Sequence, residues 1–203
     1  MAGLVGNHGL NLFLEILLAL FLFVTGLPGQ HHPAKEDEHV QDADKYLDPG
    51  IYVALNKIID IVKQAGQIYK SAGSDLGIED KGSAVNLVTK YDKMIQDFLF
   101  TELEKVVPGC KFLGEEGDDN KKLTDGYCFI IDPIDGTTNF IKGFQHSAIS
   151  VALAKDKEII IGVVLDPDLD NLFYAEKGKG AFLNGKPIHC SDCDLAHSLV
   201  LFG

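Results

Sequence analysis

The sequence predicts an α+β fold, a layered α/β sandwich with two N-terminal helices on a largely antiparallel sheet. Apolar residues recur at helical spacing before residue 108, and from Lys111 onward the pattern changes to short apolar strands. Helices that precede a series of strands, rather than alternating with them, are typical of α+β layering. The dipeptides Asp156-Lys157 and Asn184-Gly185 are typical of hairpin turns and therefore favour antiparallel pairing.

We expect the domain to occupy residues 51–203, with a hydrophobic N-terminal segment and a polar linker in residues 1–50. Residues 10–27 are an apolar run interrupted by Glu15, and residues 28–50 contain prolines and an acidic cluster, a composition typical of a linker. The apolar run fits a signal peptide, a membrane anchor or an extension upstream of the natural start. The absence of Lys or Arg before the run, and Glu15 within it, argue against both the signal peptide and the anchor, and the three alternatives stay open.

Two helices begin the domain. Apolar residues between Tyr52 and Tyr69 recur every three or four positions and predict the first amphipathic helix. Residues 73–85 contain Gly and Ser and are expected to form a loop. A second amphipathic helix is expected to begin near Asp92 and to end before Pro108-Gly109.

The strands that follow are short and apolar, and several are separated by turn residues. The expected strands are residues 111–114, 127–132, 147–155, 158–165, 171–176 and 180–183, and residues 198–202 resemble a further one. No internal repeat is visible.

The segment Asp132-Pro133-Ile134-Asp135-Gly136-Thr137-Thr138 carries the clearest chemical signal, because it follows the apolar strand that begins at Tyr127. Two carboxylates at a strand end, held by a tight turn at Pro133, suit Mg²⁺, which prefers oxygen ligands. The free N–H groups of a short helix after Gly136 suit a phosphate. Asp-Pro and Asp-Gly are also ordinary turn dipeptides, so the fragment alone fits either a turn or a metal-dependent phosphatase site.

Two upstream segments accompany it in order. They are Asn86-Leu87-Val88-Thr89-Lys90-Tyr91-Asp92 and Gly114-Glu115-Glu116-Gly117. Together the three segments resemble the inositol monophosphatase family of Mg²⁺-dependent, lithium-sensitive phosphomonoesterases, and the resemblance covers about residues 50–203. It implies the αβαβα layering of that family, of which this chain would hold the first half.

The resemblance implies a metal site with two or three Mg²⁺ ions. Its ligands would be the side chains of Glu115, Asp132, Asp135 and Asp92 and the main-chain carbonyl of Ile134, with Asp132 bridging two metals. Metal ions of this kind lower the pKa of bound water and offset charge on phosphoryl oxygens. Without the motif, Asp92 would be read as a helix-start carboxylate stabilised by the helix dipole.

The resemblance also implies substrate contacts and catalytic roles. Asp135, Gly136, Thr137 and Thr138 would bind the substrate, with backbone N–H groups of Gly136 and Thr137 on the phosphate. The Thr137 hydroxyl would be hydrogen-bonded toward Glu115 and Asp92 and would help to activate the attacking water. The catalytic candidates are therefore Thr137, Glu115 and Asp92.

The function that the resemblance implies is hydrolysis of inositol monophosphate by a metal-activated water. A fructose-1,6-bisphosphatase or a nucleotide 3′-phosphatase of the same superfamily stays open, as does a non-catalytic fragment that acts only as a binding module. The family carries a further metal-binding Asp in a W-D-x-x-A-G segment, and this chain contains no Trp. We therefore expect a chain truncated before the C-terminal half, with impaired activity.

The net charge and the cysteines limit which partners and which cellular compartment fit this chain. A formal net charge of −12 opposes a nucleic-acid surface, which needs a basic face, whereas bound metal would reverse the local sign for a small phosphorylated substrate. The resemblance leaves a homodimer open, and membrane contact is expected only if residues 10–27 act as an anchor. The cysteines imply no disulfide framework, and with the resemblance they favour the cytoplasm, with secretion or membrane anchoring through residues 10–27 as the alternative.

Overall fold

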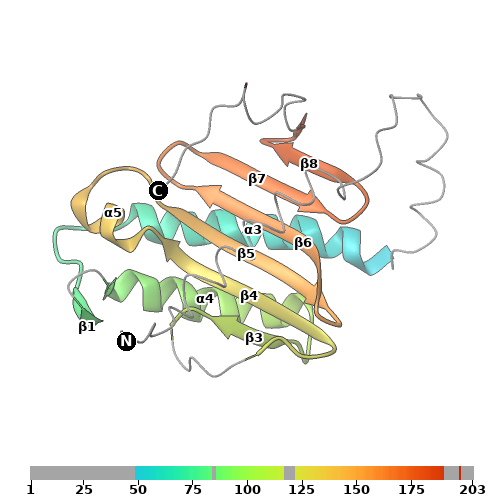
Figure 1. The fold of residues 1–203 in the computed structure, drawn as a ribbon, viewed down its shortest axis with the longest axis horizontal. Coiled ribbons are helices and arrows are strands. Elements are labelled where there is room, and N and C mark those ends of the chain that lie inside the picture. The colour runs from blue at the N-terminus through green and yellow to red at the C-terminus, as the bar shows by residue number, and fades with distance from the viewer. Residues whose placement is uncertain (1–48, 84–85, 117–121, 190–196, 198–203) are drawn as a thin grey trace.

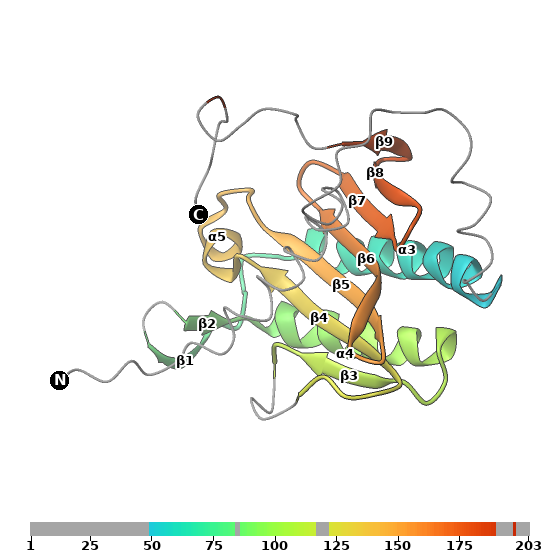
Figure 2. The same ribbon diagram turned by 45° about the vertical axis from the view of Figure 1, so that its right-hand side comes forward.

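Two long helices cover one face of a seven-stranded sheet in the computed structural model, which describes residues 49–83, 86–116, 122–189 and 197 (Figures 1 and 2). The helices are α3 (Pro49–Lys70) and α4 (Lys90–Val106). The expected α+β arrangement is confirmed. Residues 10–27 and the strand predicted at 198–202 lie outside the described residues. Within the described ranges, no helix has both the length and the apolar character needed to cross a membrane.

The sheet follows chain order from β3 to β9, and only its first pair is parallel. Its strands are β3 (Lys111–Gly114), β4 (Tyr127–Asp135), β5 (Ala148–Lys155), β6 (Glu158–Asp166), β7 (Asn171–Glu176), β8 (Gly180–Leu183) and β9 (Lys186–Ile188). Both predicted hairpin turns are confirmed: Asp156 and Lys157 have φ of 51° and 69°, and Asn184 and Gly185 have φ of 49° and 82°. Positive φ at both central residues matches the right-handed twist of the paired strands.

Three details differ from the sequence-based expectation. The segment 73–85, expected as a loop, contains β1 (Glu79–Ser83), which forms a hairpin with β2 (Asn86–Val88). β1 has no apolar residue and β2 is only three residues long, so neither shows an apolar alternation. β9 was not predicted, because Lys186-Pro187-Ile188 is too short to show a period. β4 continues to Asp135 instead of ending in a turn at Pro133.

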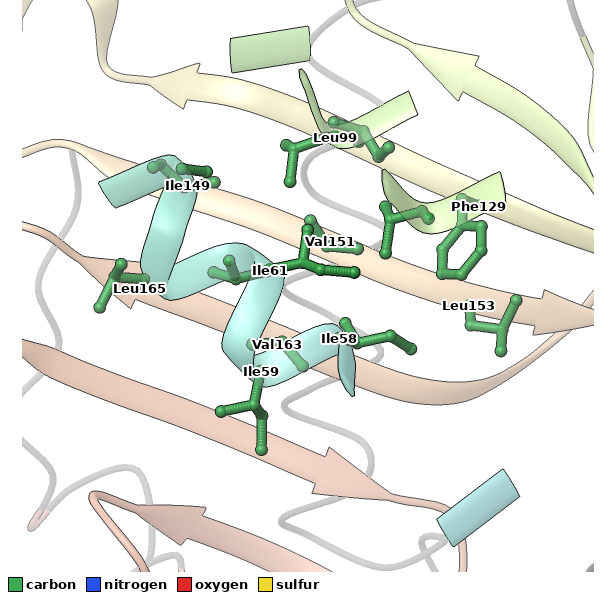
Figure 3. Close-up of a cluster of buried hydrophobic side chains, with 14 of the residues drawn as sticks. Ile58, Ile59, Ile61, Leu99, Phe129, Ile149, Val151, Leu153, Val163 and Leu165 are labelled. Carbon is green, nitrogen blue, oxygen red and sulfur yellow. The ribbon is translucent and has the colours of Figure 1, made fainter. Parts of the chain in front are cut away.

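The core lies between the helices and the sheet. α3 packs on β5 and β6, and α4 packs on β4. Figure 3 shows Ile58 of α3 beside Val151 of β5 and Val163 of β6, and all three side chains are fully buried. Full burial of such a side chain contributes about 1.5 to 3 kcal/mol, so this layer fixes the strand ends on which the polar residues lie.

Candidate metal centre

A β-bulge at the end of β4 brings two carboxylates to one face of the sheet. Asp132 pairs with Ser150 and Asp135 with Ala148, so β4 holds one more residue than β5 over this interval. Side chains alternate between faces along a strand, and an inserted residue shifts that alternation by one. Ile134 therefore joins the helix-covered core, and Asp135 returns to the face of Asp132. The turn expected at Pro133 is therefore wrong: Pro133 lies in a β-bulge, where a sheet tolerates proline.

Asp132 is buried, with 8% exposure, and its Oδ1 has no hydrogen-bond partner in the part of the chain that the structure describes. Burial, then the charges of Glu115 and Asp135, raise the pKa of Asp132 well above its ordinary value. The neighbouring Ser150, on β5, is completely buried and its Oγ is likewise without a partner among the described residues. A buried, unsatisfied carboxylate oxygen is costly and calls for a cation or another donor.

Glu115 reaches the same place from the neighbouring parallel strand. β3 pairs with β4 up to Gly114 and Ile131, and the N–H of Glu115 donates to the carbonyl of Ile131 at 3.0 Å. Burial and then the Glu115 charge raise the pKa of Asp135 to about 6. Glu115 also acts electrostatically on Asp132, as does Asp92. We call Asp92, Glu115, Asp132 and Asp135 the carboxylate cluster.

Asp92 lies at the start of α4 and has two roles there. Its Oδ2 accepts from the backbone N–H and the hydroxyl of Thr89, at 2.7 Å and 2.5 Å, and the Thr89 hydroxyl caps the helix in return. This capping box confirms the helix-start interpretation of Asp92. Its other oxygen, Oδ1, lies 3.1 Å from the Thr137 hydroxyl, which also lies 2.9 Å from the carbonyl of Ile134. The predicted contact of Thr137 with Asp92 is thus present.

The short helix α5 (Thr137–Lys142) begins directly after the bulge and lies beside β2. Gly136 precedes it with φ of 80°, and a Cβ there would lie 2.9 Å from the carbonyl oxygen of His146, so a side chain would be strained. Among the described residues, no side chain caps the first turn of α5. Thr138 lies in that turn and is exposed. The predicted substrate contacts of Asp135, Gly136, Thr137 and Thr138 stay predictions.

The donor set suits a hard cation. Carboxylate and carbonyl oxygens are the ligands that Mg²⁺ prefers, and the unsatisfied Oδ1 of Asp132 lies among them. Within the described ranges, however, no three His, Cys, Asp or Glu side chains are already grouped closely enough to hold a metal ion. The chemistry of the cluster fits Mg²⁺, and the ligand roles of Glu115, Asp132, Ile134, Asp135 and Asp92 stay predictions.

Three residues that contact or flank the carboxylate cluster were not predicted from the sequence. Thr89 belongs to a Thr-x-x-Asp capping pattern that could have been recognised. Gln96 lies one turn after Asp92; its amide donates to the carbonyl of Glu116 at 2.7 Å and accepts from the N–H of Glu116 at 3.0 Å, which holds the segment carrying Glu115. Ser150 has no local signal, because its place beside Asp132 depends on the pairing of two strands.

Comparison with known proteins is consistent with this geometry. The profile of the inositol monophosphatase family matches residues 52–203. Inositol monophosphatase 3 of Solanum lycopersicum is 43% identical over 141 residues, which are 68% of this chain and 52% of that protein. Inositol monophosphatase 2 of Saccharomyces cerevisiae is also 43% identical over 141 residues, covering 67% and 48%. The solved structure of an IMPase of Thermotoga maritima gives a TM-score of 0.60 at 34% identity, covering 66% and 52%. The chain spans about half the length of the curated relatives it matches.

Proposed function

The chain belongs to the inositol monophosphatase family, and from that premise we propose that it contributes to a Mg²⁺-dependent phosphomonoesterase that hydrolyses inositol monophosphate. The observation that carries the proposal is the carboxylate cluster, in which the buried Asp132, whose Oδ1 has no hydrogen-bond partner among the described residues, lies among further acids at the end of β4. No observation favours fructose-1,6-bisphosphate or a nucleotide 3′-phosphate over inositol monophosphate. The names of the relatives support the proposed substrate.

The residues that would hold Mg²⁺ are Glu115, Asp132 and Asp135, with the carbonyl oxygen of Ile134. Bound Mg²⁺ supplies a water of lowered pKa and offsets the charge on the phosphoryl oxygens. Two or three ions are proposed by analogy with the family. Asp132, the most buried acid of the three, gains most from a neighbouring cation because burial penalises its charged form most strongly.

Thr137 and Asp92 would handle the proton of the attacking water. The Thr137 hydroxyl lies within hydrogen-bond distance of two acceptors, Asp92 Oδ1 and the carbonyl of Ile134. When it donates to either of them, its own oxygen remains available to accept from a water. Asp92 is held in place by two hydrogen bonds from Thr89, so the acceptor does not move as the proton is handled.

The test is hydrolysis of inositol 1-phosphate by the purified chain with and without Mg²⁺. We expect Mg²⁺-dependent release of phosphate that Li⁺ inhibits and that Asp132→Asn lowers at least about a hundredfold. Asp125→Asn is the matched control, because Asp125 is an exposed carboxylate 3.3 Å from Lys157 and outside the cluster. Equal rates in the wild type and Asp132→Asn would contradict the proposal. Parallel assays with fructose 1,6-bisphosphate and a 3′-phosphorylated nucleotide test the substrate.

We also propose that the protein acts in the cytoplasm. The support is its family and its thiols, since Cys110 and Cys128 are unpaired in the described part of the chain. Cell fractionation, together with N-terminal sequencing of the natural product, tests this placement against export or anchoring through residues 10–27.

A further inference from the structure

The C-terminal end of α3 reaches the end of the sheet at which α5 lies (Figure 1). Tyr69, in the last turn of α3, is 6% exposed, and its ring packs against Phe140 of α5 with centroids 4.7 Å apart. Its hydroxyl donates to Asp168 Oδ2, in the turn between β6 and β7, at 2.9 Å. Residues 99 positions apart thus meet beside α5.

Ser147 holds the turn between β4 and α5 to which Phe140 also bonds. The Ser147 hydroxyl donates to the carbonyl of Gly136 at 3.1 Å. The same carbonyl accepts from the N–H of Phe140 at 3.0 Å, so both of its lone pairs are used. Gly136 is therefore held from inside α5 and from the segment before β5.

The turn between β6 and β7 that carries Asp168 is held by hydrogen bonds of its own. Asp166 Oδ1 accepts from the N–H groups of Asp168 and Leu169, each at 3.0 Å, which fixes the turn that carries Asp168. Burial and the hydrogen bond to Asp168 raise the pKa of Tyr69 to about 12, so the phenol remains a protonated donor at neutral pH. A buried hydroxyl bonded to a carboxylate is among the stronger hydrogen bonds in a protein.

We propose that Tyr69, Ser147 and Asp168, here called the Tyr69 clamp, are positioning residues that fix the turn carrying Asp135 and Thr137. Gly136 lies between those two residues, so a displacement of its carbonyl moves both the carboxylate and the hydroxyl. The clamp acts on both through the Gly136 carbonyl. Its role in catalysis rests on the proposed function, whereas its hold on the turn does not.

The first test is amide hydrogen exchange in the full chain without metal. Tyr69→Phe keeps the ring against Phe140 and removes the hydroxyl, and we expect exchange of the Phe140 N–H to become about tenfold faster, as loss of one net hydrogen bond implies. Tyr91→Phe is the matched control: Tyr91 also packs on Phe140, with centroids 6.0 Å apart, but its hydroxyl accepts from the N–H of Gly73. Equal exchange of Phe140 in the two variants would overturn the clamp.

The second test separates positioning from general stability. We expect Tyr69→Phe to raise the Mg²⁺ concentration for half-maximal hydrolysis by about threefold to tenfold, since small displacements of ligating groups weaken a site. A simple loss of folded protein lowers the rate without moving this concentration. Asp168→Asn keeps an acceptor for Tyr69 and should stay within about twofold of wild type, whereas Asp168→Ala should resemble Tyr69→Phe.

The two tests fail in distinguishable ways. A wild-type chain without phosphatase activity would contradict the proposed function, while the exchange of the Phe140 N–H would still decide whether the clamp holds the turn. Unchanged Mg²⁺ dependence in an active Tyr69→Phe variant would overturn its positioning role even if exchange were faster.

Discussion

Replacement of Asp135 by Asn should stabilise the metal-free protein at neutral pH. Burial and the charge of Glu115 raise the pKa of Asp135 from its ordinary value of 3.8 to about 6. The folded state therefore binds a proton more readily than the unfolded state between these two values. By linkage, the free energy of unfolding of the wild type falls as pH rises from about 4 to 6. Above pH 6 this loss of stability has reached its full size.

The size of the effect follows from the same two values. A rise from 3.8 to about 6 corresponds to about 3 kcal/mol between the two protonation states. Asp135 is only partly buried, and solvent screening reduces the measurable part to about 1 to 2 kcal/mol. Asn cannot ionise and keeps a similar shape. The free energy of unfolding of Asp135→Asn should therefore exceed that of the wild type by this amount at pH 7.5 and should equal it below pH 4.

The assay is urea unfolding of both proteins in a chelator at several pH values. Asp125→Asn, an exposed carboxylate outside the cluster, serves as the control and should change stability by less than about 0.5 kcal/mol. Added Mg²⁺ should reverse the order, because an ion that binds only the folded state stabilises the wild type more than the variant. An Asp135→Asn variant that is less stable than wild type at pH 7.5 without metal would refute this reasoning.

Thr137→Ala should lower the rate of inositol 1-phosphate hydrolysis about a hundredfold, because the hydroxyl next to Asp92 is lost, and Thr137→Ser should recover most of it in steady-state assays. A Thr137→Ala variant as active as wild type would exclude the proton-handling role. Thr89→Ala should cost about 1 to 2 kcal/mol in urea unfolding through loss of the capping box, and an unchanged midpoint would show that the cap is not needed. Gly136→Ala should cost about 2 to 3 kcal/mol, because a Cβ there meets a carbonyl oxygen at 2.9 Å, whereas Gly126→Ala, with positive φ in open space, should cost only about 1 to 2 kcal/mol. Equal losses in thermal unfolding would mean that the contact around Gly136 relaxes.

The sequence predicted the elements whose signals are local. α3 and α4 are long enough for their apolar spacing to be recognised, and the dipeptide Asp156-Lys157 predicts the β5–β6 hairpin. The β1–β2 hairpin was not predicted, because β1 has no apolar residue and β2 has only three residues, so that the hairpin depends on backbone pairing. The bulge at Pro133 was read as a turn, since proline favours turns locally and only the register against β5 shows that the strand continues.

The candidate site divides in the same way. Asp132, Asp135 and Glu115 could be found because a motif in the chain marks them. The neighbours that complete their surroundings come from remote parts of the sequence: Ser150 meets Asp132 through strand register, and Tyr69 reaches the α5 turn from the end of α3. Contacts of this kind depend on the three-dimensional arrangement, so no local pattern could have predicted them.

Calorimetric titration of the full chain with Mg²⁺ tests the central claim most directly, because it asks whether the carboxylate cluster holds the ion regardless of substrate. We predict binding by the wild type and by Asp125→Asn at millimolar Mg²⁺ or below, and a loss of at least about tenfold in affinity in Asp132→Asn. Absence of binding by the wild type, or equal binding by Asp132→Asn, would contradict the assignment of the cluster as a metal centre.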